Sequence, residues 1–244
     1  MFKMGDVIAI TSAKGGVGKS TICCHLAKAF ANKLKKVILV ETDSGLRVLD
    51  IFLGVKDVVY DLGDVLKENC SLKEAILNVK DNLFLLAAPF NFNTKLNSKT
   101  ILKICNNLKE LFDIVIIDVK TDPAFTFKIK SVVDFFLIVV NLDFVCVRDT
   151  AIFSNMLKNE IKGKPTLRLI VNKLKKNIKK TSPFNNLDDI IDETNLQLIG
   201  VLPFSKDIQH KTQHGKNLNP KSVLYKIFTA ISNRIEGKNS DIII

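Results

Sequence analysis

The chain contains short, continuously apolar runs separated by longer segments with helical periodicity. A run that stays apolar at every position, without alternating, is typical of a parallel strand covered by helices on both faces. We therefore predict a buried, mainly parallel sheet. The runs that we interpret as its strands are residues 7–10, 37–40, 83–86, 114–117, 135–140, 167–171 and 198–202.

The segments between these runs show the spacing of amphipathic helices. In residues 20–34, apolar side chains recur every three or four positions and so share one helix face. The same pattern predicts helices at 98–112, 148–160 and 222–235. Strands that alternate with helices form right-handed βαβ units, so we predict a doubly wound α/β fold with ligands at the carboxyl ends of its strands. No linker divides the chain, and we expect one domain over residues 1–244.

A glycine-rich segment, Thr-Ser-Ala-Lys-Gly-Gly-Val-Gly-Lys-Ser-Thr at residues 11–21, connects the first predicted strand to the first predicted helix. This context is that of a phosphate-binding loop, in which backbone N–H groups and the helix N-terminus attract phosphate oxygens. We predict that Lys19 contacts the β- and γ-phosphates and that the Ser20 hydroxyl ligates Mg²⁺. The predicted nucleotide-binding residues of this loop are Lys14, Gly15, Gly16, Val17, Gly18, Lys19, Ser20 and Thr21.

The loop departs from the usual G-x-x-x-x-G-K-[ST] pattern at two positions. Ala13 replaces the first glycine, and Lys14 adds a second lysine. The form K-G-G-x-G-K-[ST] resembles the deviant Walker A motif of the MinD/ParA family of P-loop ATPases. The resemblance implies that ATP is the ligand and that Lys14 acts in catalysis with Lys19, reaching across a homodimer to the partner's ATP. The alternative is an ordinary solvated lysine.

Acidic residues follow two of the predicted strands. Asp118 ends the run at 114–117, the position of an aspartate that binds Mg²⁺ directly or through water. The segment E-T-D-S-G-L-R-V-L-D at 41–50 resembles D-x-D-x-G-L-R-N-L-D of MinD proteins. That resemblance implies that Asp43 orients the attacking water and that Glu41, in place of the usual aspartate, holds water around the magnesium. A polar cap at the strand end is the alternative for Asp43.

The loop after Asp118 is irregular. MinD proteins continue D-[ST]-P-A-G, whereas this chain reads Val-Lys-Thr-Asp-Pro-Ala at 119–124, without glycine and with the proline displaced. Because that loop senses the nucleotide state in the family, we predict slow or altered ATP hydrolysis.

Two further positions resemble the base-binding part of the family site. Asn172 ends the run at 167–171, and its amide can both donate to and accept from adenine. Pro203 closes Gly-Val-Leu-Pro, which precedes the loop that flanks the base. A simple turn residue is the alternative for Asn172. The resemblance extends over residues 5–236.

Amino-acid composition narrows the classes of protein, cysteine chemistry and partners that the chain can have. Hydrophobic residues make up 47% and charged residues 25%, as in a globular protein with a large core, and no apolar run is long enough to span a membrane. We expect a cytoplasmic protein. The five cysteines form no CxxC pair, which argues against disulfides, a zinc site and the metal-cluster carriers of this superfamily. The net charge of +11 suits an anionic partner, and the lysine-rich stretch at 173–180 is either a solvated loop or a phosphate contact.

The end of the chain departs from the family. MinD proteins end in a basic amphipathic helix that lies on the membrane, so the resemblance implies peripheral association with the inner face of the cell membrane in the ATP-bound form. Residues 237–244 contain one lysine and one aspartate beside three isoleucines, a poor basic face. The apolar stripe in the helix before it is better explained by packing on the sheet; its members are Val223, Leu224, Ile227, Phe228, Ile231 and Ile235.

The leading hypothesis is a MinD-like, Mg-dependent ATPase whose ATP-bound homodimer places the division site and is reset by hydrolysis. The resemblance implies MinC-like and MinE-like partners, or other division-site regulators. One alternative is a ParA-like partitioning ATPase that binds DNA through its lysines, although the MinD-like stretch at 45–88 speaks against a nucleic-acid partner. Another is a localisation scaffold that binds nucleotide and barely hydrolyses it.

Overall fold

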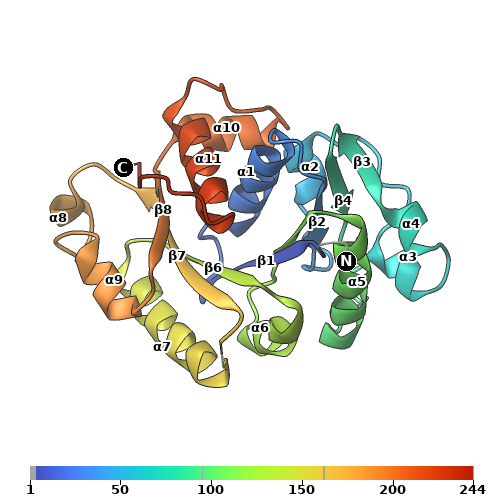
Figure 1. Ribbon diagram of the computed structural model, residues 1–244, viewed down its shortest axis with the longest axis horizontal. Helices are drawn as coiled ribbons and strands as arrows, with labels where there is room; N and C mark the ends of the chain where they lie inside the picture. The colour runs from blue at the N-terminus through green and yellow to red at the C-terminus, as the bar shows by residue number, and fades with distance from the viewer. Residues whose placement is uncertain (1–3, 95, 162, 244) are drawn as a thin grey trace.

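A computed structural model describes residues 4–94, 96–161 and 163–243 of the chain. Its eight-stranded sheet has the order β3-β4-β2-β5-β1-β6-β7-β8 (Figure 1). The strands are β1 (Asp6–Thr11), β2 (Val37–Glu41), β3 (Leu77–Lys80), β4 (Leu83–Leu86), β5 (Ile114–Asp118), β6 (Phe135–Val140), β7 (Thr166–Leu174) and β8 (Leu198–Pro203). All seven predicted strands are confirmed.

The sheet is mainly parallel, as predicted. Strand β1 lies between β5 and β6 and pairs in parallel with both. The exception among the described strands is the hairpin of β3 and β4, which is antiparallel. Sequence reasoning missed β3 because this edge strand is short and alternates between half-buried and exposed residues, without a continuous apolar run.

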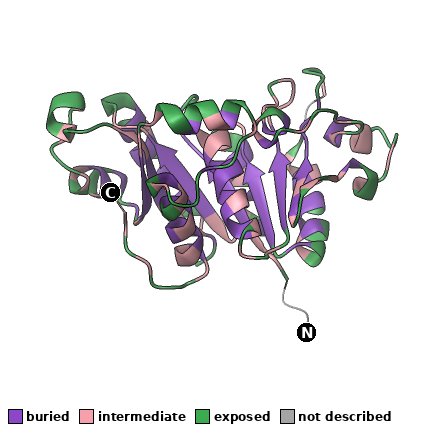
Figure 2. Cartoon of the chain, turned by 90° about the horizontal axis from the view of Figure 1, so that it is seen from above, coloured by how far each residue is buried: buried purple, intermediate pink, exposed green. Residues whose placement is uncertain are grey.

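Helices cover both faces of the sheet, and the strands between them are buried (Figure 2). The predicted helices are confirmed; α7 starts four residues earlier than expected because Asp143 caps it, accepting from the Cys146 N–H at 2.9 Å. One face carries α1 (Lys19–Ala31), α2 (Leu49–Leu53), α10 (Lys206–Gln213) and α11 (Val223–Ile235). The other carries α5 (Ser98–Leu111), α6 (Pro123–Ile129), α7 (Phe144–Glu160) and α9 (Asp188–Thr194). The short elements α3 (Leu62–Leu66), α4 (Leu72–Ala75), η1 (Lys130–Val132) and α8 (Ile178–Thr181) lie in the connections.

Helix α11 packs on α1 and β8, which confirms that its apolar stripe belongs to the core. Val223, at the first turn, is 54% exposed and does not join the other five stripe residues. After the helix the chain folds back: Arg234 donates to the backbone oxygens of Ser240 and Ile199 at 2.6 Å each, and Ile242 and Ile243 pack against the core. Position 244, the last of the three terminal isoleucines, lies outside the described residues.

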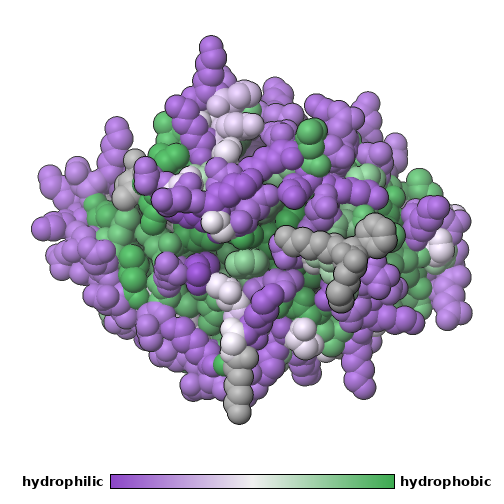
Figure 3. Space-filling model, in the orientation of Figure 1, coloured by the Kyte–Doolittle hydropathy of each residue, from purple (hydrophilic) through white to green (hydrophobic). Residues whose placement is uncertain are grey.

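The visible surface is largely hydrophilic, with smaller apolar areas between the charged side chains (Figure 3). In the lysine-rich stretch, Lys175, Lys176, Lys179 and Lys180 are exposed. The five cysteines are free. Within the described ranges, no helix has the length and apolar character needed to cross a bilayer.

Candidate nucleotide-binding site

The glycine-rich loop lies at the carboxyl end of β1, in the middle of the sheet, and leads directly into α1. Gly16 and Gly18 adopt left-handed backbone angles, with φ of 74° and 102°. At Gly18 the backbone angle favours glycine, and an added Cβ, 2.4 Å from the Asn172 Nδ2 atom, would displace that amide. The loop opens onto a cavity of about 300 Å³ whose lining includes Gly16, Gly18, Lys19, Ser20, Thr21, Asn172 and Pro203.

Two loop residues outside this lining behave differently. The side chain of Val17 is buried in the core, so it offers a ligand only its backbone. Gly15 is exposed and has no heavy atom within 4 Å of an added Cβ. Gly15 therefore faces solvent, and the space around it would admit a side chain.

The two lysines of the loop point to different partners. Lys19 donates from Nζ to the Thr121 hydroxyl at 2.7 Å, across the site to the segment after β5. Lys14 forms an ion pair with Asp143 at 3.2 Å, and the two side chains are 45% and 50% exposed. An exposed pair of this kind is worth at most about 1 kcal/mol, so Lys14 can leave Asp143 at little cost. The action of Lys14 across a dimer stays a prediction.

Asp118 is buried at the end of β5, opposite Ile10 of β1 and Glu41 of β2. Burial raises the pKa of its carboxyl to about 6, while the Ser20 hydroxyl and the Lys19 ammonium oppose that increase. Asp118 ends the strand that pairs with β1, and β1 leads into the loop and helix that carry Lys19 and Ser20. A hydroxyl and a carboxylate are hard oxygen ligands of the kind Mg²⁺ prefers, and a dication would relieve the cost of burying the charge. These residues fit a magnesium ion.

Asp43 lies half-buried in the loop after β2, close enough for its charge to raise the pKa of Asp118. Its neighbour Thr42 ties this loop to the segment after β5. The Thr42 N–H and hydroxyl donate to the backbone oxygen of Asp118 at 3.2 and 2.8 Å, and the hydroxyl accepts from the Lys120 N–H at 3.0 Å. The loop that carries Asp43 is thus held to the end of β5, where Asp118 lies.

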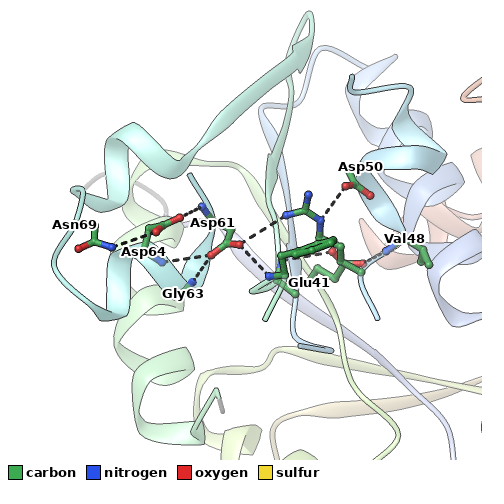
Figure 4. Close-up of polar contacts among 10 residues, drawn as sticks. Glu41, Val48, Asp50, Asp61, Gly63, Asp64 and Asn69 are labelled. Atoms are coloured by element: carbon green, nitrogen blue, oxygen red, sulfur yellow. Dashed lines mark hydrogen bonds and ion pairs between the residues drawn. The ribbon is translucent and has the colours of Figure 1, made fainter. Parts of the chain in front are cut away.

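The structure gives Glu41 a different environment from the one that the resemblance implies. Its buried carboxylate accepts from the backbone N–H groups of Val48 at 2.6 Å, Leu49 at 3.1 Å and Ala88 at 3.4 Å (Figure 4). Glutamate is one methylene longer than aspartate, and this length lets the carboxylate reach across the loop after β2. These bonds fix the chain on either side of Asp43, and the role of Glu41 in holding water around the magnesium stays a prediction.

We expect Glu41→Gln to flatten the pH dependence of stability between pH 5 and 7. Burial raises the pKa of Glu41 from 4.5 to about 7, against the effect of its backbone hydrogen bonds, so the folded chain retains a proton that the unfolded chain releases. Stability is therefore lost as pH rises through this window, by about 3 kcal/mol for one such group. Urea unfolding of both proteins across the window measures the difference in slope. Parallel curves would contradict the assignment.

Arg47 organises the outer side of the same loop and was missed by sequence reasoning. Its Nε lies 3.0 Å from Asp50 Oδ2, and its NH1 lies 3.7 Å from Asp61 Oδ2. The guanidinium carbon is 5.0 Å from the centre of the Phe90 ring. Asp61 also accepts from the N–H groups of Phe90 and of Gly63 in α3, so Arg47 joins three segments (Figure 4). The G-L-R stretch in the quoted motif was the available signal.

Asn172 contacts the phosphate loop in addition to lining the cavity. Its Nδ2 donates to the Val17 backbone oxygen at 2.7 Å, and its Oδ1 accepts from the Lys173 N–H at 2.9 Å. Lys173 in turn donates from Nζ to the Gly16 backbone oxygen at 2.7 Å. The end of β7 thus supports the loop from the side, and reading of adenine by Asn172 remains a prediction.

The central strand, the left-handed glycines, the lysine at the helix start and the buried aspartate define a P-loop nucleotide-binding protein. Residues 8–219 match the CobQ/CobB/MinD/ParA nucleotide binding domain, and the chain belongs to this family. Within the family it is a homologue of the septum site-determining protein MinD. It is 32% identical to MinD of Bacillus subtilis and 34% to MinD of Synechocystis, in each case over 97% of this chain and 91% of the relative.

Solved structures agree with this assignment. The chain is similar to a chain of the MinC:MinD cell division protein complex of Aquifex aeolicus, with a TM-score of 0.86 and 28% identity over 98% of this chain and 99% of that one. MinD of Pyrococcus horikoshii, solved with Mg-ADP, has a TM-score of 0.84 and 24% identity over 96% of each chain. The fold is therefore that of MinD, and the similarity to septum site-determining proteins supports a MinD-like role in division-site placement.

Proposed function

We propose that this chain is an ATP-driven dimerisation switch: Mg-ATP brings two copies together, and hydrolysis separates them. The observation that carries the proposal is the divergence of the two loop lysines. Lys19 bonds to Thr121 across its own site, whereas Lys14 is 45% exposed and pairs with Asp143. A lysine that pairs outside its own phosphate loop, as Lys14 does, supports a contact with the nucleotide of a partner chain.

Different residues of the site supply the groups that phosphoryl transfer to water requires. Lys19 would hold the β- and γ-phosphates, and Ser20 and Asp118 would hold a magnesium ion, which would supply positive charge to neutralise the phosphates. Asp43 orients the attacking water from the loop that Glu41 and Arg47 fix. Asn172 and Pro203 receive the base in the cavity that they line.

Slow turnover is part of the proposal, because the loop after Asp118 has no glycine and its proline begins α6. By analogy with the MinC:MinD complex of Aquifex aeolicus, a MinC-like protein is the expected partner of the ATP-bound dimer, with a MinE-like regulator as a second. We propose that the chain works in the cytoplasm and associates peripherally with the membrane when ATP is bound.

Size-exclusion chromatography with light scattering tests the switch. In Mg²⁺, we expect a monomer with ADP and a dimer with ATP or a non-hydrolysable analogue. The reason is that the γ-phosphate supplies the charge that the partner's Lys14 would meet. The same mass in both nucleotides would contradict the proposal, and measured ATP turnover separates a resetting switch from a static scaffold.

A further inference from the structure

The segment after Asp118 is fixed at both of its ends. The Lys120 N–H donates to the Thr42 hydroxyl at 3.0 Å, and Asp122 caps α6 by accepting from the Phe125 N–H at 3.1 Å. The Lys120 side chain turns to Asp122, with its Nζ 3.3 Å from the carboxylate. Thr121 lies between these two anchors, so its backbone is held in place although the residue is exposed.

The hydroxyl of Thr121 is directly beside the phosphate-binding lysine. It accepts from Lys19 Nζ at 2.7 Å, over a sequence separation of 102 residues. A lysine at this position of a P-loop contacts the β- and γ-phosphates. A hydroxyl within hydrogen-bonding distance of that ammonium therefore lies at the edge of the γ-phosphate position. The MinD pattern D-[ST]-P-A-G is not kept here, so Thr121 is not a residue that this family motif already names.

We propose that Thr121 is a γ-phosphate contact that distinguishes ATP from ADP. The inference rests on the proposed function and deepens it. A hydroxyl has one donor and two acceptor positions. It accepts from Lys19 before the triphosphate binds. When the triphosphate binds, the hydroxyl can keep this bond to Lys19 and donate its own proton to a γ-phosphate oxygen. ADP has no oxygen at that position, so it gains nothing from the hydroxyl.

The consequence is a difference in affinity that depends on one side chain. Thr121→Ala is expected to weaken binding of a non-hydrolysable triphosphate about tenfold, the usual scale for a hydrogen bond to a charged group. Its affinity for ADP stays within about twofold of the original, because Lys19 still reaches the β-phosphate. Thr121→Ser keeps the hydroxyl and is expected to retain the original ratio of the two affinities.

Isothermal titration calorimetry with AMPPNP and with ADP, both in Mg²⁺, measures these ratios. Each variant is made also in the Lys14→Ala background, so that dimer formation does not add to the triphosphate affinity. Thermal melting checks that all variants fold. An equal loss of both nucleotides, an unchanged ratio in Thr121→Ala, or a serine variant that behaves like alanine would overturn the inference. A parent chain that binds neither nucleotide would instead refute the proposed function on which it rests.

Discussion

Lys14→Ala is expected to abolish ATP-dependent dimerisation while the monomer still binds Mg-ATP. The Lys14 ammonium is half exposed and pairs with Asp143, outside the contacts that Lys19 makes. Its removal therefore leaves the phosphate cavity of its own chain intact. Between two chains, it removes the cation that would face the partner's γ-phosphate. Light scattering with saturating ATP should then report a monomer at concentrations where the original chain is a dimer.

Asp143→Asn is the matched control. An asparagine oxygen can still accept from the Cys146 N–H, which Asp143 contacts at 2.9 Å, so α7 keeps its cap. The change removes the charge that holds Lys14 within its own chain. We expect this variant to dimerise with ATP at least as readily as the original. Dimerisation that is indifferent to Lys14, or equal loss in both variants, would rule out its action across the interface.

Lys19→Ala is expected to weaken Mg-ATP binding by about two orders of magnitude. A charge-assisted bond contributes about 1.5–3 kcal/mol, and each 1.4 kcal/mol corresponds to about tenfold in affinity. The change also removes the positive charge beside the buried Asp118, whose pKa Lys19 lowers. The pKa of the Asp118 carboxyl should therefore rise in the variant. Calorimetric titration with Mg-ATP measures the loss.

Lys173→Ala controls for the general effect of removing a lysine near the loop. Its Nζ donates to the Gly16 backbone oxygen at 2.7 Å and so supports the loop from outside. We expect less than about a tenfold loss, since a single hydrogen bond that supports the structure contributes about 1 kcal/mol. Equal losses at positions 19 and 173 would show that Lys19 has no special role toward phosphate.

The sequence predicts the central part of this fold well because a strand buried on both faces must be apolar at every position. Strands β1, β2, β5 and β6 follow that rule. It fails at β3, whose exposed face permits polar residues, and at short helices such as α3 and α4. Capping boxes at Asp61 and Ser71 fix where these helices begin. With five and four residues, the helices are too short to show a periodic pattern.

The backbone of the site was predictable, and the contacts of its side chains were not. A glycine-rich turn between a strand and a helix has few geometries, so residues 14–20 could be placed from the motif. The pair of Lys14 and Asp143 joins positions 129 residues apart, and nothing in the spacing indicates it. Glu41 illustrates the limit: its place at the strand end was clear, but one extra methylene brings its oxygens to backbone N–H groups of two loops.

The position of β1 between β5 and β6 has a consequence for how the loop opens. Both edges of this strand are hydrogen-bonded, and no local fraying can release the base of the loop without separating the middle of the sheet. The amide protons of β1 should therefore exchange with solvent only through global unfolding, whereas those of the edge strand β3 should exchange through local fluctuations. We therefore expect the binding energy of the nucleotide to add to the stability of the whole chain against unfolding.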